Sequence, residues 1–500
     1  MQPIDYVILV FYFLLLIAVG IWASRRVHNS ADYFTAGGKL PWWLTGISHH
    51  VSGYSGAVFV AYAGVAYTHG FSLYIWWAGG IFISTIIAAH VVAPRWSRLR
   101  SRLSIQSPTE YLSVRYNLTT QQIMAWSGVI IKIFDVGAKW AAIAILLHVF
   151  TGIPFLAGIL IAGSVSLIYG ILGGLLADVL NDFAQFIIQL VAGFTMFFLI
   201  LRELGDGLSG YITMWDSLPD SHSQMFNQPY TLGFFAAILI IDFFSYSGGT
   251  WHLATRFISS PSGKQAQKAA LLSSVLYLLW PLILFFPLFA APIFIKDLAD
   301  PTQSYALMAL KFLPTGLLGL VLASLFTNTL SMTSSDANTI SAVITRDILP
   351  NIFPKLKTAN ARTMLILARV STFLFTFLTI IIAVYSDSFG GVFGLIITWF
   401  AALVGPISIP MILGLLPLFR RSNSNSAIIS IVCGIITFAI LKITGQTSLA
   451  VEIASPMLCS LVIYVFSGLI TGKKVPEQVN KLLDSLQYDD LKEIKAENHK

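Results

Sequence analysis

Charged residues are scarce in this sequence, because Asp, Glu, Lys and Arg together make up only 11% of its 500 residues. A soluble protein of this length needs many more charges to cover its surface. Hydrophobic residues, in contrast, account for 56% of the chain. The composition therefore excludes a soluble globular protein and predicts a membrane protein that crosses the bilayer many times.

Cysteine is equally rare. Cys433 and Cys459 both lie in apolar segments, so no disulfide framework is expected. Neither GxxxxGK[ST] nor GxSxG occurs in a suitable context, which argues against a nucleotide-driven pump and against a hydrolase. No HExxH or CxxC spacing accompanies the histidines at 49, 50 and 252, so we expect no cofactor and no transition-metal site.

The net charge of +7 does not point to nucleic acid, because the basic residues are spread over many short loops. Alternate loops carry most of them, as the positive-inside rule requires. The residues on the basic side are Arg25, Arg26, Lys39, Arg95, Arg98, Arg100, Arg102, Arg256, Lys264, Lys268, Arg346, Lys355, Lys357, Arg420, Arg421, Lys473 and Lys474. We therefore expect the N-terminus outside and the C-terminus inside.

Apolar segments long enough to cross a bilayer recur along the chain, since about 20 helical residues span the roughly 30 Å of hydrocarbon. They lie near 4–24, 43–67, 72–94, 120–148, 154–172, 183–202, 232–256, 269–294, 316–344, 363–384, 389–418, 426–442 and 450–471. The first has no basic residue before it, which argues against a cleaved signal peptide. We expect one all-α polytopic domain of about thirteen transmembrane helices over 1–471, followed by a cytosolic tail at 472–500.

Two of these segments contain runs of glycine and serine. They are V-S-G-Y-S-G-A-V at 51–58 and F-S-Y-S-G-G-T-W at 244–251. Close helix packing is one explanation for such residues. A matched pair of interruptions, five segments apart and in oppositely directed helices, instead predicts broken helices in an inverted-repeat transporter with its binding site at the breaks.

Ionisable residues also occur within the apolar segments. Asp135 has Lys132 three residues before it and Lys139 four residues after it, so the three share one face of a helix. Such groups are costly in a membrane and face a partner or a cavity. The three residues either neutralise one another and stabilise the bundle, or leave one member to bind a polar solute.

Asp182 opens the sixth apolar segment, and a hydroxyl-rich run, T-L-S-M-T-S-S-D-A-N-T-I-S, ends the ninth at 329–341. The carboxylate either caps a helix or binds a cation. The hydroxyls of Ser331, Thr333, Ser334 and Ser335 either bond to the carbonyls of their own helix or supply the oxygen ligands that a hard cation such as sodium prefers.

Several longer motifs, in order and at matching spacing, resemble the sodium:solute symporter family, which includes sodium–glucose, sodium–proline and sodium–sialic acid transporters. They are S-A-D-Y-F-T-A-G-G-K-L-P-W-W (30–43), S-P-T-E-Y-L-S-V-R-Y (107–116), Y-G-I-L-G-G-L-L-A-D-V-L-N-D-F-A-Q (169–185), T-R-D-I (345–348) and G-P-I-S-I-P-M-I-L-G-L-L (405–416). The third is similar to the family signature YxxxGGLxAVxxTDxxQ. The resemblance extends from about residue 5 to 470.

The resemblance implies a LeuT-type fold with two inverted five-helix repeats. On this pattern an extra N-terminal helix covers 4–24, the first repeat 43–202, the inverted second repeat 232–418, and the extra C-terminal helices 426–471. It also implies sodium-driven uptake by alternating access through a monomeric functional unit in the cell inner membrane.

The family's sodium sites transfer to this chain residue by residue. Val51, Tyr54, Asn328 and Ser331 match the general sodium site, although its second hydroxyl position is Met332, which has no side-chain oxygen. The additional sodium site of members that couple two ions matches Asp182, Ser331, Ser334 and Ser335. The resemblance therefore favours coupling through the additional site.

The solute positions match less well. By the resemblance they are Ser55, Trp77, Asp135, Lys139, Tyr246, Thr398 and Trp399. Tyr246 matches the aromatic residue that closes over the sugar, whereas Trp77 and Thr398 replace an acidic and an amide contact of galactose members. Trp76, Trp77, Tyr246 and Trp399 are suited to stack on a pyranose ring, and Asp135 to accept its hydroxyls.

These observations favour a sodium symporter that imports a sugar or sugar derivative. Two alternatives are an importer of an organic acid or amino acid, which would use Lys132 or Lys139, and a non-transporting solute sensor. The expected partners are sodium, a small solute and the lipid bilayer.

Overall fold

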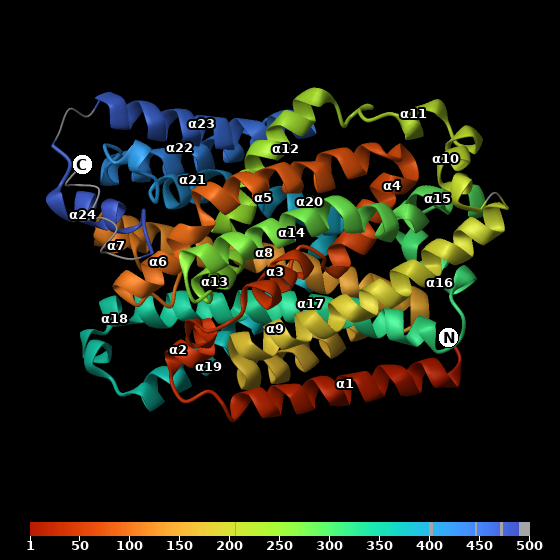
Figure 1. Ribbon diagram of the computed structural model, residues 1–500, viewed down its shortest axis with the longest axis horizontal. Coiled ribbons are helices and arrows are strands. Elements are labelled where there is room, and N and C mark those ends of the chain that lie inside the picture. Colours follow the sequence, from red (N-terminus) through yellow and green to blue (C-terminus); the bar gives the residue numbers. More distant parts are fainter. Residues whose placement is uncertain (206, 400–403, 446–447, 471–473, 490–500) are drawn as a thin grey trace.

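The computed structural model describes residues 1–500 except 206, 400–403, 446–447, 471–473 and 490–500. The secondary-structure elements of the described part are all helices, and it contains no strand. Its long helices lie side by side along the longest dimension of the molecule, with α1 at one edge and α22 and α23 near the opposite edge (Figure 1). The all-α prediction is therefore confirmed.

The helices that follow the predicted segments most closely are the long ones. They are α1 (Pro3–Ser24), α8 (Leu118–Thr151), α9 (Phe155–Leu204), α14 (Gly263–Leu284), α17 (Leu317–Ala342), α19 (Ala361–Val384), α22 (Ser424–Ile443) and α23 (Leu449–Ile470). The shorter ones include α2 (Ser30–Thr35), α3 (Trp42–Val51), α4 (Ala63–His69), α5 (Gly80–Val91), α6 (Ala93–Leu103), α7 (Leu112–Arg115), α10 (Gly210–Thr213), α11 (Asp220–Ser223), α12 (Leu232–Phe244), α13 (His252–Ile258), α15 (Phe286–Phe294), α16 (Ser304–Phe312), α18 (Leu349–Ile352), α20 (Gly391–Trp399), α21 (Gly405–Leu413) and α24 (Glu477–Ser485).

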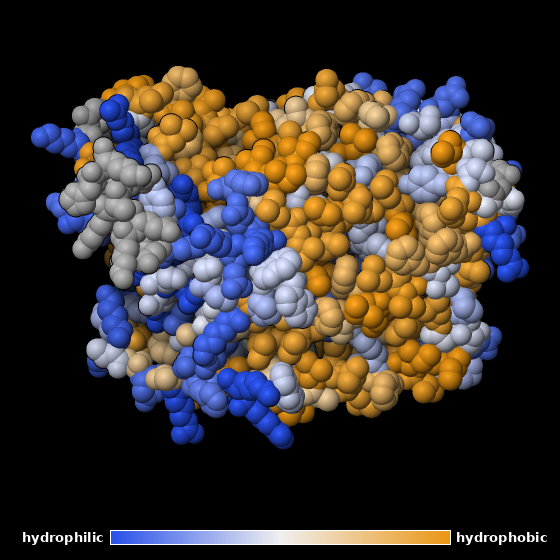
Figure 2. Space-filling view, viewed as in Figure 1, coloured by the Kyte–Doolittle hydropathy of each residue, from blue (hydrophilic) through white to orange (hydrophobic). Residues whose placement is uncertain are grey.

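Nine helices of the described residues are long and apolar enough to cross a membrane, and a bent pair, Leu118–Thr151 with Phe155–Leu167, brings the number to ten. The predicted segment 43–67 is not among them because it is divided into α3 and α4. An apolar surface lies between two more polar ends of the molecule (Figure 2). These features define a multi-pass membrane protein.

The element α9 contains the fifth and the sixth predicted segments as two helices that meet at a kink, since the backbone of Gly174 is not helical. The part from Gly174 to Leu204 is long and apolar enough to cross a membrane by itself. Its backbone turns at Gly174, where φ is 58° and ψ is −166°, a conformation that glycine adopts without steric cost. A Cβ at this position would lie 2.7 Å from the carbonyl oxygen of Tyr33. Asp182 lies two turns farther on, inside continuous helix, so its interpretation as a helix cap is wrong.

The helix α17 lies at the centre of the molecule and packs against α9, α8 and α19. Every residue from Val321 to Ala342 is buried. The hydroxyl-rich run is therefore shielded from lipid and from bulk water, and each of its polar groups needs a partner inside the protein or in a cavity.

The C-terminal residues before 490 fold back onto the protein. Arg98 on α6 donates from Nε to Asp489 Oδ1 at 2.9 Å, and the backbone N–H groups of Gly263 and Lys264 donate to the same carboxylate. Burial alone would raise the pKa of Asp489, but these hydrogen bonds, that of Arg98 first, lower it below its ordinary value of 3.8. The segment predicted as a cytosolic tail is thus docked up to Asp489.

Candidate functional site

The first predicted break is present in the structure. The helix α3 ends at Val51, and helical structure resumes in a π-helical turn at Val58–Tyr62. The Val51 carbonyl accepts a hydrogen bond from the N–H of Tyr54, and the N–H of Gly56 donates to Thr329 Oγ1 on α17 at 2.9 Å. The break is therefore fastened to the central helix by its backbone.

The second predicted break follows α12. A π-helical turn spans Ser245–Gly249, and Gly248 has φ of 111°, which only glycine adopts readily. The indole Nε1 of Trp96 donates to the buried backbone carbonyl of Ser247 at 2.8 Å. A side chain from α6 thus satisfies a carbonyl that the break releases.

A cavity lies between the two breaks and encloses about 810 Å³ of space, counted with the solvent at its mouth. Its charged or titratable lining residues are Asp135, Lys139, Asp242 and His252. Its aromatic lining residues are Tyr62, Trp76, Trp77 and Tyr246, and the others include Ser52, Ser55, Ser245, Thr250 and Met332. Side chains from both broken segments and from α8 and α17 meet at this place, so it is the candidate solute site.

Five of the seven residues predicted to contact the solute line this cavity: Ser55, Trp77, Asp135, Lys139 and Tyr246. Thr398 is partly buried on α20 but is not among the described lining residues. The side chain of Trp399 lies outside the described side chains. Tyr246 packs edge-on against Tyr277, with 5.4 Å between the ring centroids.

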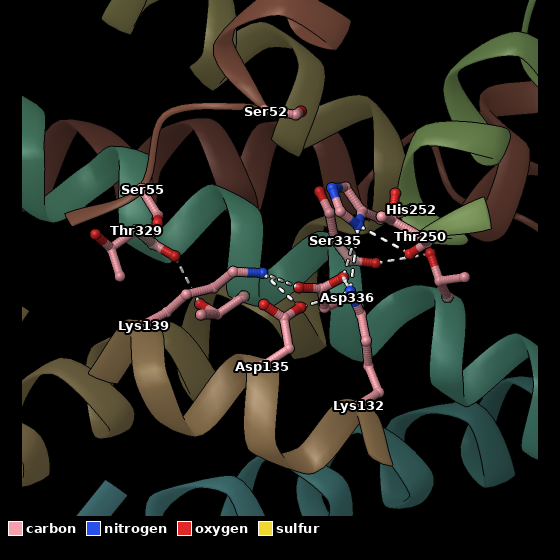
Figure 3. Close-up of polar contacts among 12 residues, drawn as sticks. Ser52, Ser55, Lys132, Asp135, Lys139, Thr250, His252, Thr329, Ser335 and Asp336 are labelled. Carbon is pink, nitrogen blue, oxygen red and sulfur yellow. Dashed lines mark hydrogen bonds and ion pairs between the residues drawn. The ribbon is translucent and has the colours of Figure 1, made fainter. Parts of the chain in front are cut away.

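The predicted charged face of α8 forms a buried cluster of ion pairs at the cavity wall (Figure 3). Lys132 Nζ lies 2.6 Å and Lys139 Nζ 2.9 Å from Asp135 Oδ2. Each lysine also reaches Asp336 on α17, at 2.8 Å and 2.5 Å respectively. His252 Nδ1 lies 2.9 Å from Asp336 Oδ1. The cluster therefore joins α8, α17 and the second broken segment.

Asp336 had no role in the sequence-based prediction. The sequence did contain a signal for Asp336. Lys132 and Lys139 carry two positive charges on one helix face, and Asp135 balances only one of them. Inside a membrane protein such an excess calls for another carboxylate. In the structure Asp135 and Lys139 are neutralised within the cluster and also line the cavity, so binding of a polar solute by one of them stays a prediction.

The predicted additional sodium site brings together α9 and α17. Ser331 Oγ donates to Asp182 Oδ1 at 2.6 Å, and Ser48 Oγ of α3 donates to Asp182 Oδ2 at 2.5 Å. Ser335 Oγ donates instead to a second carboxylate, Asp178 Oδ2, at 2.9 Å. Ser334 is buried beside it on the same helix. The donor set of carboxylates and hydroxyls suits sodium.

Some hydroxyl groups of α17 bond to carbonyls of their own helix, and others are directed at a neighbouring helix. Those of Thr327, Thr333 and Thr339 donate to carbonyls of their own helix, four residues earlier. Ser331 and Ser335 instead reach across to α9. The threonines therefore satisfy the helix, whereas the serines build the candidate ion site.

Sequence reasoning missed two charged residues of this site. Asp178 stands where the family signature has valine, which was the available signal. Arg256 was counted as a loop residue in the orientation argument, but its side chain on α13 is completely buried. Its Nη2 donates to Asp182 at 3.3 Å and to Ser335 at 2.8 Å, and its Nε donates to Ser48 at 3.0 Å.

The residues of the predicted general sodium site, unlike those of the additional site, contact different parts of the protein. Val51 and Tyr54 are buried in the first break. The side-chain amide of Asn328 has no hydrogen-bond partner among the described residues, and Ser331 is engaged by Asp182. Met332, at the second hydroxyl position, lines the solute cavity. A thioether therefore lines the cavity where a ligand oxygen was expected.

Two helices broken at the centre of the bundle, a cavity between them with charged and hydroxyl side chains in its lining, and a buried cluster of carboxylates and hydroxyls are typical of a secondary transporter. The comparison with known proteins gives its family. The profile of the sodium:solute symporter family matches residues 33–434, and the chain belongs to this family. Its members are sodium-coupled transporters, so the protein is not an enzyme and uses sodium as its coupling ion.

Curated relatives have different solutes in their names. The chain is 25% identical to a sodium/glucose cotransporter of Vibrio parahaemolyticus, over 94% of this chain and 91% of that one. It is 24% identical to the sodium/sialic acid symporter NanT of Aliivibrio fischeri, over 87% and 86%. It is also 24% identical to the human sodium/myo-inositol cotransporter 2, over 87% and 69%.

A solved structure gives the fold. The outward-open, substrate-bound form of a Na⁺-coupled sialic acid symporter superposes with a TM-score of 0.81, covering 95% of this chain and 100% of that one at 19% identity. The structure of Mhp1, a nucleobase-cation-symport-1 family transporter, is more distant, with a TM-score of 0.59. The LeuT-type fold expected from the sequence is therefore confirmed.

Proposed function

We propose that the protein is a sodium-coupled symporter that imports a polar small solute, a sugar or sugar derivative, by alternating access. The observation that carries the proposal is the charge count at the candidate ion site. Asp178 and Asp182 supply two carboxylates, and Arg256 supplies one guanidinium to the same hydrogen-bond network. One monovalent cation balances the remaining negative charge, which is otherwise costly in a membrane interior.

Sodium at this site would be held by Asp182, Ser331, Ser334 and Ser335, with Asp178 adding negative charge beside them. Ser48, which donates to Asp182, belongs to the helix that ends at the first break. Ion binding would therefore fix the broken helix relative to α9 and α17. Such binding stabilises the outward-open arrangement, the solute then binds between the breaks, and both are released inside.

The solute class rests on the cavity lining. Trp76, Trp77, Tyr62 and Tyr246 offer ring faces for a pyranose or cyclitol, and Ser55, Asp135 and Asp242 offer acceptors for hydroxyl groups. An organic acid or amino acid is less favoured, because Lys132 and Lys139 already contact two carboxylates each. The names of the relatives, which include glucose, sialic acid and myo-inositol, support the same solute class.

The topology is part of the proposal. We place thirteen transmembrane helices in the bilayer, with the N-terminus outside, the C-terminus in the cytosol, and a monomer as functional unit in the inner membrane. The first repeat spans 43–202 and the inverted second repeat 232–418, between an extra helix at 4–24 and extra helices at 426–471. The equivalent position of the two breaks, one in each repeat, supports this division.

The test is uptake of labelled sugars into proteoliposomes with an inward sodium gradient. We expect Asp182→Asn to reduce sodium-driven uptake at least about tenfold, because a contact to a charged group contributes roughly 1.5–3 kcal/mol. Asp387→Asn, the same change at an exposed carboxylate, should leave uptake unchanged. Normal sodium dependence in Asp182→Asn would refute coupling through this site.

Two other results of the same assay would refute the function itself. Uptake driven by sodium for organic acids or amino acids, with no uptake of sugars, would identify the alternative solute class. Sodium-dependent binding of a sugar without any uptake would identify a sensor rather than a transporter.

A further inference from the structure

The cavity contains one carboxylate that the ion-pair cluster does not use. Asp242 lies in the last turn of α12, directly before the second break, and is 5% exposed. Its side chain has no hydrogen bond or ion pair with any described residue, and its Oδ2 is fully enclosed. Oδ2 faces Gly80 of α5, where an added Cβ would lie only 2.6 Å away. Glycine at position 80 thus leaves room for the carboxylate.

A charge count around the cavity separates Asp242 from the other acidic residues. Lys132 and Lys139 are each shared between Asp135 and Asp336, so two positive and two negative charges cancel. His252 is directed at Asp336 as well. In its ionised form Asp242 therefore adds one negative charge that no described cation balances. An isolated carboxylate in a membrane interior is costly, and it persists where a ligand supplies the opposite charge.

The aromatic residues of the cavity favour a cation at the same place. Tyr62 packs perpendicular to Trp76, with centroids 5.3 Å apart and an angle of 88°, and it also packs against Trp77. All three rings line the cavity together with Asp242. Aromatic faces attract ammonium groups and also pack on the carbon skeleton of a sugar.

We propose that the solute is a sugar derivative with a free amino group, an unacylated amino sugar or aminocyclitol, whose ammonium group binds Asp242. The inference rests on the proposed function and specifies its substrate. The ring lies against the aromatic residues, and the ammonium donates charge-assisted hydrogen bonds to the carboxylate, which are stronger than neutral ones. Asp242 is thus the residue that selects the charged derivative over the neutral sugar.

The experiment compares solutes that differ at one group. D-glucosamine, D-glucose and N-acetyl-D-glucosamine share a ring but carry an ammonium, a hydroxyl and a neutral amide, and myo-inositol with an amino-inositol forms a second pair. Binding to the full-length protein in sodium is measured by calorimetry at mildly acidic pH, where the amines are charged. We expect each amino compound to bind at least about tenfold more tightly than its neutral counterpart.

The variant Asp242→Asn keeps the shape of the side chain and removes its charge. It should weaken binding of the amino compounds about 10- to 100-fold and binding of glucose by much less, because the amide oxygen of Asn still accepts hydrogen bonds from hydroxyl groups. Ser245→Ala, a neutral change in the same cavity, should affect charged and neutral solutes alike. The comparison of solutes on the unaltered protein tests the proposal even where Asp242→Asn does not fold.

Three outcomes would overturn the inference. Equal binding of glucose and glucosamine, or equal loss of both in Asp242→Asn, would show that Asp242 does not distinguish charged from neutral solutes. The proposed sodium–sugar symport would not be affected by that result. Tighter binding of N-acetylglucosamine would point to a neutral amide instead. Failure of every sugar and cyclitol to bind in sodium would refute the proposed function together with the inference.

Discussion

Removing the charge of Asp336 tests the central ion-pair cluster most directly. In Asp336→Asn, Lys132 and Lys139 lose partners at 2.8 Å and 2.5 Å, and His252 loses one at 2.9 Å. Two ammonium groups then share Asp135 alone, with one uncompensated positive charge. All these side chains are at most 6% exposed, and Asp336 itself is fully buried, so water solvates the two ammonium groups poorly once the carboxylate is lost.

Breaking a buried ion pair by removing one partner costs about 3–5 kcal/mol, and we expect Asp336→Asn to lower the free energy of unfolding by that amount. Adding Lys132→Met removes the excess charge and leaves the 2.9 Å contact between Lys139 and Asp135. The double variant should therefore be more stable than the single one by about 1–3 kcal/mol, the usual range for coupled neighbours.

The assay is denaturant unfolding of the purified protein in detergent, followed by the fluorescence of its 12 tryptophans. Asp387→Asn, an exposed carboxylate, serves as the matched control and should change the free energy by less than about 0.5 kcal/mol. The reasoning fails if Asp336→Asn behaves like this control, or if Lys132→Met makes it less stable instead of rescuing it.

Two further predictions concern the ion site and the C-terminal segment. Met332→Ser places a hydroxyl at the expected ligand position, so uptake should reach half its maximum at a lower sodium concentration and should depend more steeply on that concentration. Met332→Leu should not show this change in a sodium titration. Asp489→Asn removes the acceptor of Arg98 and of two backbone N–H groups, so limited proteolysis should cut the C-terminal segment faster. Because the pKa of Asp489 lies below 3.8, docking in the unaltered protein should persist as pH falls and weaken only below that value; loss of docking near neutral pH would contradict this.

The sequence predicted the features that depend on local spacing. Glycine and serine runs located both helix breaks, because backbone flexibility is encoded within a few residues. The shared face of Lys132, Asp135 and Lys139 followed from helical periodicity, and the structure places all three in one cluster.

The sequence did not predict partners that come from distant helices. Asp336 approaches Lys139 across 197 positions of chain, and Arg256 approaches Asp182 across 74, so only the packing of helices brings them together. Asp182 was also placed at a helix start, because the apolar segment begins only at residue 183, whereas the second helix of α9 already begins after the kink at Gly174. Hydropathy reports lipid exposure, whereas Leu175, Ala177 and Asp178 just before Asp182 are buried in protein.

The surplus negative charge at Asp178 and Asp182 also has an electrical consequence. Arg256 cancels one of the two carboxylates, so on the proposed coupling a bound sodium ion makes the site neutral and its release leaves a charge of minus one. A membrane voltage then acts on the empty carrier as it resets rather than on the loaded carrier. Moving one charge across 100 mV is worth up to about 2.3 kcal/mol, so voltage would set the turnover rate mainly through the return step.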